Sequence, residues 1–192
     1  REKAEPLVAR GARWADNPLS ACDRVLISLY TTDTVAEVLG QMEEGLRPGQ
    51  ILIDTTTGEP EQTVELGTRL AARGVQYLDA PISGSSEQTR RGEVTTIVGG
   101  PREAFDACRD LMDCFSAKTI YAGPCGAAAK MKLVSNLVLG LNRAALAEGL
   151  ADPAQSVDSR LARLRVLEEF CAEDATIGQQ PPVLEKLLGA LK

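Results

Sequence analysis

The chain has 192 residues, enough for one full domain or two small ones. Its apolar fraction of 44% and its charged fraction of 25%, mixed in sign, are those of a globular protein and argue against disorder. The net charge of −6 with no basic run argues against a nucleic-acid partner, and no apolar run reaches the length that spans a membrane.

Short apolar runs and helix-like stretches alternate along the first half of the chain. Short helices are predicted at 2–10 and from Leu19, with a brief strand at 12–15. Buried strands are expected at 25–29, 51–54 and 75–79, separated by helices at 34–39, with Asp33 as N-cap, and at 60–72, opened by Pro60. This alternation predicts a parallel, doubly wound α/β sheet covered by helices on both faces.

The second half of the chain becomes mainly helical. Strands at 95–98 and 118–121 bracket a helix predicted at 102–115. A long helix rich in Ala and Leu is expected at 127–150, and the looser pattern beyond it contains two further helices, at 160–171 and 183–191. The α/β half is therefore followed by a long helix and a helical C-terminal part.

Cysteine and histidine usage limits the chemistry. The five cysteines are odd in number and none has CxxC spacing, which favours a reduced, cytoplasmic protein over a disulfide framework. Histidine is absent from all 192 residues, which removes histidine triads, bases and metal ligands, and no metal site is expected. Lys, Asp, Glu, Ser, Thr, Tyr or Cys must carry any reaction.

Polar residues follow the predicted strands, at the sheet edge where doubly wound proteins bind ligands. These segments are 29–30, 54–57 and 79–81. Asp79 could act as an acid or base, but a structural role at its strand end is favoured. Cys125 at a loop-to-helix junction could form a thiolate, but a small residue filling a small space is the favoured interpretation.

Lys132 and Asn136 are four residues apart on the long predicted helix and so share one of its faces. Lys130, two positions earlier, is expected to face elsewhere. Among apolar neighbours, Lys132 would be partly desolvated, which lowers the pKa of an ammonium group and suits it to proton transfer. On spacing alone, Lys132 could instead be a surface lysine and Asn136 a polar contact to a neighbouring helix.

Ser83 and Gly84 follow a predicted strand directly. A hydroxyl and free backbone amides in such a loop can bind a carboxylate, although the pair could also be a simple turn.

Three segments, at 79–85, 92–100 and 123–136, together resemble the β-hydroxyacid dehydrogenases, which include 3-hydroxyisobutyrate dehydrogenase. The order and the spacing of the segments both match that family. The resemblance implies a Rossmann-like sheet and makes Lys132 the catalytic general acid or base. It implies that Ser83 and Gly84 bind the acid group of the substrate, and that Asn136 orients the lysine or holds the substrate. Ser85 stands where the family often has a second glycine.

The same resemblance points to Leu29, Tyr30 and Thr57 as contacts for the cofactor, NADP or NAD. Tyr30 stands where the family commonly has proline, and 55–57 could also be a plain strand exit that caps the next helix. A lean toward NADP rests on Arg1 and Lys3.

Two parts of the family pattern are missing. The glycine-rich GxGxxG turn that cradles a pyrophosphate is absent, and the family's late lysine has no clear match, although Arg163 or Arg165 stands near its place. We therefore expect a partial nucleotide-binding domain over 1–125, an incomplete helical domain for substrate and oligomerisation over 126–192, and a larger parent chain.

The resemblance implies an oxidoreductase that interconverts a short 3-hydroxy acid and its semialdehyde, working as a homodimer or homotetramer. A different hypothesis is a degenerate, non-catalytic relative that serves as an oligomerisation or scaffold module. A third, a flavodoxin-like nucleotide-binding domain of unrelated function, leaves Ser83, Lys132 and Asn136 unexplained.

Overall fold

The computed structural model of the chain describes residues 4–151, with side chains described as far as residue 147. Several sequence-based predictions lie outside these residues. They are the helices at 160–171 and 183–191, and the assignments made for Arg1, Lys3, Arg163 and Arg165.

The helices follow the predicted order with shifted ends. α3 (Thr32–Gln41) starts earlier than expected, because the Thr31 hydroxyl, and not Asp33, accepts a hydrogen bond from the backbone and caps it. α4 (Pro60–Ala71) and α8 (Ala127–Ala151) match closely. The helix predicted at 102–115 is broken at Cys108 into α6 and α7. The other helices described are α1 (Glu5–Val8), α2 (Pro18–Ala21), η2 (Glu43–Gly45), α5 (Ser86–Arg90), α6 (Arg102–Ala107) and α7 (Arg109–Met112).

The strands form one mixed sheet in the order β1-β2-β3-β5-β4, with β6 paired to β5. β1, β2 and β3 are parallel and in register, as predicted. β5 is antiparallel to both β3 and β4 and parallel to β6, so the sheet is mixed beyond the three parallel strands of the first half. No strand forms at 12–15, where one was predicted. The bounds are β1 (Arg24–Ile27), β2 (Ile51–Asp54), β3 (Gln76–Asp79), β4 (Ile82–Ser83), β5 (Val94–Gly99) and β6 (Ser116–Gly123).

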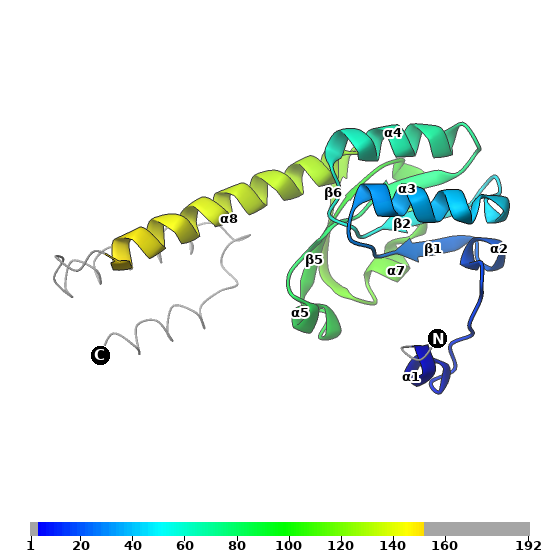
Figure 1. The fold of residues 1–192 in the computed structure, drawn as a ribbon, viewed down its shortest axis with the longest axis horizontal. Coiled ribbons are helices and arrows are strands. Elements are labelled where there is room, and N and C mark those ends of the chain that lie inside the picture. Colours follow the sequence, from blue (N-terminus) through cyan, green and yellow to red (C-terminus); the bar gives the residue numbers. More distant parts are fainter. Residues whose placement is uncertain (1–3, 152–192) are drawn as a thin grey trace. The chain divides into compact units, whose positions relative to one another are not determined.

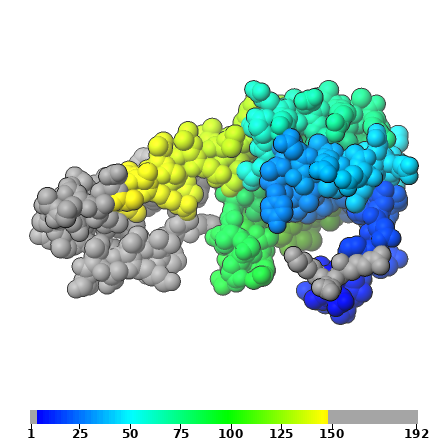
Figure 2. Space-filling view, viewed as in Figure 1, coloured from blue at the N-terminus to red at the C-terminus, as the bar shows by residue number. Residues whose placement is uncertain are grey.

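Helices cover both faces of the sheet, which is the doubly wound arrangement. Because successive strand residues point to opposite faces, Leu52 packs toward α3 and α4 while Ile53 packs toward α6 and α7. Figure 1 shows α3 and α4 together on one side of the sheet, and in Figure 2 their atoms form a continuous surface. The α3/α4 core contains Leu19, Val35, Leu39, Leu52, Leu66, Leu70, Val75 and Tyr77, and the α6/α7 core contains Ile51, Ile53, Leu78, Ala80, Val98, Ala104, Phe105, Cys108 and Met112.

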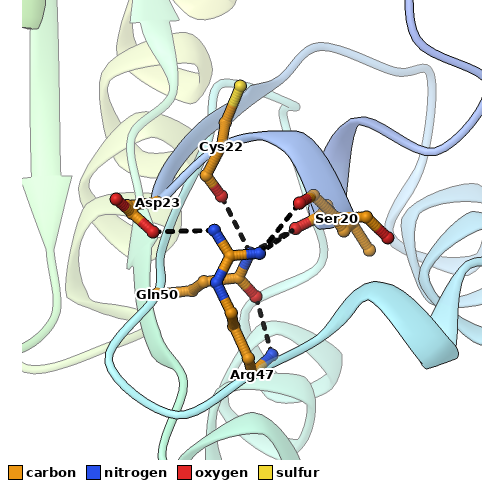
Figure 3. A network of polar contacts seen from close by, with 6 residues as sticks. Ser20, Cys22, Asp23, Arg47 and Gln50 are labelled. Carbon is orange, nitrogen blue, oxygen red and sulfur yellow. Dashed lines mark hydrogen bonds and ion pairs between the residues drawn. The ribbon is translucent and has the colours of Figure 1, made fainter.

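A polar network around the buried Gln50 side chain fixes the amino-terminal ends of β1 and β2 (Figure 3). The Gln50 amide, 1% exposed, donates to the carbonyls of Leu19 and Cys22 and accepts from the backbone amide of Arg47. The Arg47 guanidinium donates to the Leu19 carbonyl and bonds the Asp23 carboxylate at 2.7 Å. The network ties the segment before β1 to the turn before β2.

The chain divides into two compact units, residues 1–135 and 136–192. The boundary falls within α8, and the first unit contains the whole sheet. The functional domain boundary predicted at 125/126 stays a prediction.

Candidate active site

The carboxyl ends of β1, β2 and β3 lie at the same edge of the sheet because these strands are parallel. Three segments leave this edge: the loops at 28–31 and 55–59, and the segment 80–85, which contains the short strand β4. They contain five of the predicted site residues, namely Leu29, Tyr30, Thr57, Ser83 and Gly84.

Threonine hydroxyls join the loop after β1 to the loop after β2. The Leu29 amide donates to the Thr56 hydroxyl at 3.1 Å, and the Thr55 hydroxyl donates to the Ile27 carbonyl at 2.8 Å. The Glu59 amide donates to the Thr32 hydroxyl at 3.0 Å. The hydroxyls of Thr55 and Thr56 are therefore already hydrogen-bonded within the protein. The side-chain cap of α4 is Glu59, and not one of the threonines at 55–57.

The remaining side chains of these two loops are open to solvent. Tyr30 is 92% exposed and Thr57 is exposed. Within the described part of the chain, the Thr57 hydroxyl has no hydrogen-bond partner. The structure therefore brings Leu29 against Thr56 and leaves Tyr30 and Thr57 available to a ligand.

Two buried carboxylates, which sequence reasoning did not combine, end β2 and β3. Asp54 and Asp79 are register partners, and both are buried. The Tyr77 hydroxyl donates to Asp54 Oδ2 at 2.6 Å, and the Thr56 amide donates to Asp54 Oδ1 at 2.9 Å. The Ala129 amide of α8 donates to Asp79 Oδ2 at 3.0 Å.

Burial raises the pKa values of the three ionisable side chains in this cluster, Asp54, Asp79 and Tyr77. Loss of water raises the pKa of Asp54 and of Asp79, although hydrogen bonds to each carboxylate oppose the rise. Burial, with the nearby Asp54 charge, also raises the pKa of Tyr77. The only sequence signal for this cluster was that polar residues end two neighbouring apolar strands.

Ser83 ends β4, where its backbone pairs with Thr95 of β5. Gly84 follows with φ +150°, and a Cβ at this position would meet a Val94 methyl carbon at 2.6 Å. The bend therefore requires glycine, and it leaves Ser83 half-buried and Gly84 exposed. Ser85 forms a capping box with Gln88 at the start of α5, which gives the serine in place of a glycine a local role.

Lys132 lies on α8 and is 8% exposed. Burial lowers the pKa of its ammonium group, as the sequence predicted. Leu133 and Val134, its apolar neighbours in sequence, are exposed and do not bury it. Lys130 is exposed, in agreement with its predicted different direction.

Asn136 follows Lys132 by one helical turn but falls in the second compact unit. Its side chain is exposed. Among the residues that the structure describes, no hydrogen bond or ion pair joins the Lys132 amine to Ser83 or to Asn136. A catalytic grouping of these three residues therefore stays a prediction.

The exposed loop groups fit one half of a nicotinamide dinucleotide. An aromatic ring such as that of Tyr30 can lie against a flat heterocycle, and the Thr57 hydroxyl can bond a ribose. No GxGxxG turn occurs in the 192 residues to hold the pyrophosphate. Within residues 4–151, no helix combines the length and the apolar character needed to cross a bilayer.

Comparison with known proteins also indicates a nucleotide-binding domain. Residues 1–123 match the family described as the NAD binding domain of 6-phosphogluconate dehydrogenase. The chain is 35% identical over 153 residues to 3-hydroxyisobutyrate dehydrogenase of Pseudomonas aeruginosa, covering 76% of this chain and 51% of that protein. It is 34% identical over 157 residues to the cytokine-like nuclear factor N-PAC of Danio rerio, covering 78% of this chain and 34% of that protein.

A solved structure gives the same picture. The 3-hydroxyisobutyrate dehydrogenase of Mycobacterium tuberculosis, solved with L-serine, superposes with a TM-score of 0.71 at 26% identity. The match covers 77% of this chain and 52% of that one. The chain thus spans about half the length of the two dehydrogenases, and about a third of N-PAC.

Proposed function

Since this chain belongs to the hydroxyacid dehydrogenase family that carries the NAD binding domain of 6-phosphogluconate dehydrogenase, we propose that it serves an oxidoreductase acting on a short 3-hydroxy acid and its semialdehyde. The observation that carries the proposal is Lys132 on α8, a lysine only 8% exposed, whose pKa is lowered by burial. A lowered pKa increases the fraction of neutral amine, which can accept a proton, and the ammonium form can return it.

In the proposed reaction, Lys132 removes the hydroxyl proton of the acid during oxidation and protonates the carbonyl oxygen during reduction. Ser83 and Gly84 hold the substrate carboxylate, through a hydroxyl and through the backbone of a bend that lacks a side chain. Asn136 orients the lysine or holds the substrate. The relative solved with L-serine, itself a 3-hydroxy acid, supports this substrate class.

Leu29, Tyr30 and Thr57 would contact the nicotinamide half of NADP or NAD at the carboxyl ends of β1 and β2. When bound, that nucleotide accepts or delivers the hydride. No GxGxxG turn occurs in these 192 residues, so the proposal assigns none of them to the pyrophosphate. Domains at 1–125 and 126–192, a homodimer or homotetramer, and a cytoplasmic location are further parts of the proposal.

Turnover of 3-hydroxyisobutyrate and of L-serine with NAD and with NADP tests the proposal. Lys132→Ala should lower kcat by about 100-fold or more, the usual size of a general acid–base contribution. Lys130→Ala is the matched control, because it removes an exposed lysine from the same helix and should leave kcat unchanged. Undiminished turnover in Lys132→Ala, or equal losses in both variants, would rule out the assignment of Lys132.

The similarity to N-PAC, which is named as a nuclear factor and not as a dehydrogenase, favours a second candidate. In that case the chain is a non-catalytic module for oligomerisation or scaffolding. Titration with NADPH and NADH, followed by nucleotide fluorescence, separates the two. Saturable binding supports the enzyme, and absence of binding together with absence of turnover supports the module.

A further inference from the structure

The start of α8 rests on the end of β3. Asp79 is the last residue of β3, and its Oδ2 atom accepts a hydrogen bond from the Ala129 amide in the first turn of α8 at 3.0 Å. The backbone amides of Gly126 and Ala128 also stabilise the charged form of this carboxylate and so lower its pKa, against the larger effect of burial. Amides at a helix start are not used within the helix, so an anion placed there is favourable.

Gly99 of β5 provides the space that this contact needs. It is the register partner of Asp79, and a Cβ at this position would stand 2.4 Å from Asp79 Oδ1, 2.8 Å from the Pro124 carbonyl oxygen and 3.1 Å from the Ala128 amide. Three segments, β3, the 123–126 loop and α8, therefore meet where Gly99 has no side chain.

Lys132 lies on the same side of α8 as this contact. Residues three and four apart are neighbours on a helix, so Ala128 and Ala129 stand one turn before Lys132. These three residues are buried, whereas Lys130, Met131, Leu133 and Val134 are exposed. The buried stripe that begins on Asp79 is thus the stripe that holds the lysine.

The geometry points to Asp79 as the positioning residue of Lys132: its carboxylate, seated against Gly99, fixes the first turn of α8 and thereby the buried place of the lysine. The inference rests on the proposed function for its catalytic meaning. It also gives a use to a costly group, because Asp79 Oδ1 is buried and has no hydrogen-bond partner among the described residues. Its neighbour Asp54 has both oxygens bonded.

Two measurements on the 192-residue chain test the inference without requiring turnover. The first is amide hydrogen exchange at Ala128 and Ala129. The second is the pKa of Lys132, followed by NMR of labelled lysine side chains, with exposed Lys130 as internal reference. Asp79→Ala removes the contact, Asp79→Asn keeps an acceptor oxygen, and Gly99→Ala displaces the carboxylate while every titratable group remains.

In Asp79→Ala and Gly99→Ala, exchange at the two amides should accelerate about tenfold, the size of a lost helix cap. The Lys132 pKa should rise, because the amine leaves its desolvated place. Asp79→Asn should preserve most of the protection. Loss of a nearby negative charge alone would lower the lysine pKa, so the direction of the shift separates positioning from a charge effect.

Asp54→Asn is the matched control, since it replaces an equally buried carboxylate that bonds Thr56 and Tyr77 and not α8. It should change neither measurement. Unchanged protection and an unchanged Lys132 pKa in Gly99→Ala, or equal changes in Asp54→Asn, would overturn the inference. If Asp79→Ala does not fold, Gly99→Ala and Asp79→Asn decide.

Turnover distinguishes this inference from the proposed function. If the parent chain oxidises a hydroxy acid, Asp79→Ala should lower kcat while the KM for the nucleotide stays the same, and Asp79→Asn should restore most of kcat. If the parent shows no turnover but its Lys132 pKa responds to Gly99→Ala, the positioning role stands and the proposed function fails.

Discussion

Asp54 and Asp79 are two buried acids side by side at the end of a sheet, and burial acts on both in the same direction. A raised pKa in the folded state means that the folded protein holds the proton more tightly than the unfolded chain. The stability that Asp54 contributes is therefore fully present below its ordinary pKa of 3.8 and is lost as the pH rises through its raised folded-state value. Asp110 has the opposite sign, because its hydrogen bond to Arg24 lowers its pKa.

Asp54→Asn should consequently raise the melting temperature by a few degrees at about pH 7, where the buried carboxylate is costly. At about pH 4 the melting temperature should not change. The amide can keep the Thr56 amide as donor, and the Tyr77 hydroxyl can turn to accept. Thermal unfolding across this pH range, in parent and variant, measures the effect. Asp110→Asn serves as the comparison and should lower the melting temperature slightly, at neutral pH only. A parallel pH dependence in the parent and in Asp54→Asn would contradict the argument.

At the scale of elements, one polar side chain, that of Gln50, connects the segments that precede β1 and β2. Gln50 is buried and serves two carbonyls and one amide that belong to different segments (Figure 3). Removing it takes this partner from the Cys22 carbonyl and the Arg47 amide, and leaves the Leu19 carbonyl with its bond from the Arg47 guanidinium.

We expect Gln50→Ala to lower the free energy of unfolding by about 2–3 kcal/mol, because buried polar groups lose their hydrogen bonds. Chemical denaturation measures this value. Gln41→Ala is the matched control, since the exposed Gln41 amide bonds only Glu37 one turn away on α3, and the loss should stay below about 0.5 kcal/mol. Similar losses in the two variants would show that the network adds nothing to an ordinary glutamine.

Sequence patterns predicted elements well where the signal is local. Pro60 marks the start of α4, and the apolar run at 51–54 coincides with β2. The direction of β5 was not predictable, because it depends on where the chain returns after the bend at Gly84. The break of the helix at Cys108 and the capping of α3 by Thr31 were not predicted either, because the local sequence also allows a continuous helix and a cap at Asp33.

The candidate site divides in the same way. The lowered pKa of Lys132 was predicted in direction, but its sequence neighbours Leu133 and Val134 are exposed and do not cause it. The hydrogen bond between the Ala129 amide and Asp79 spans 50 positions of sequence and depends on a glycine on a third segment, so no local pattern reports it.

For the molecule as a whole, the outer edge of β1 matters most. β1 ends the strand order and pairs only with β2, and in the part of the chain that the structure describes no strand lies along its other side. Its burial is incomplete, with Leu26 47% exposed. An edge with free backbone groups and an apolar side chain is a template for pairing with another strand.

The isolated 192-residue chain should therefore associate through β1 as its concentration rises, and light scattering should report masses above 20.5 kDa. Leu26→Lys places a charge on this edge and should shift the association to clearly higher concentration. Val64→Lys is the matched control, because Val64 is an apolar residue of similar exposure, 41%, on α4 and away from the edge. Each variant changes the net charge of −6 by one unit, so an effect of net charge predicts equal results, whereas edge pairing predicts an effect of Leu26→Lys alone. If the unmutated 192-residue chain stays monomeric at every concentration, the edge of β1 is already protected.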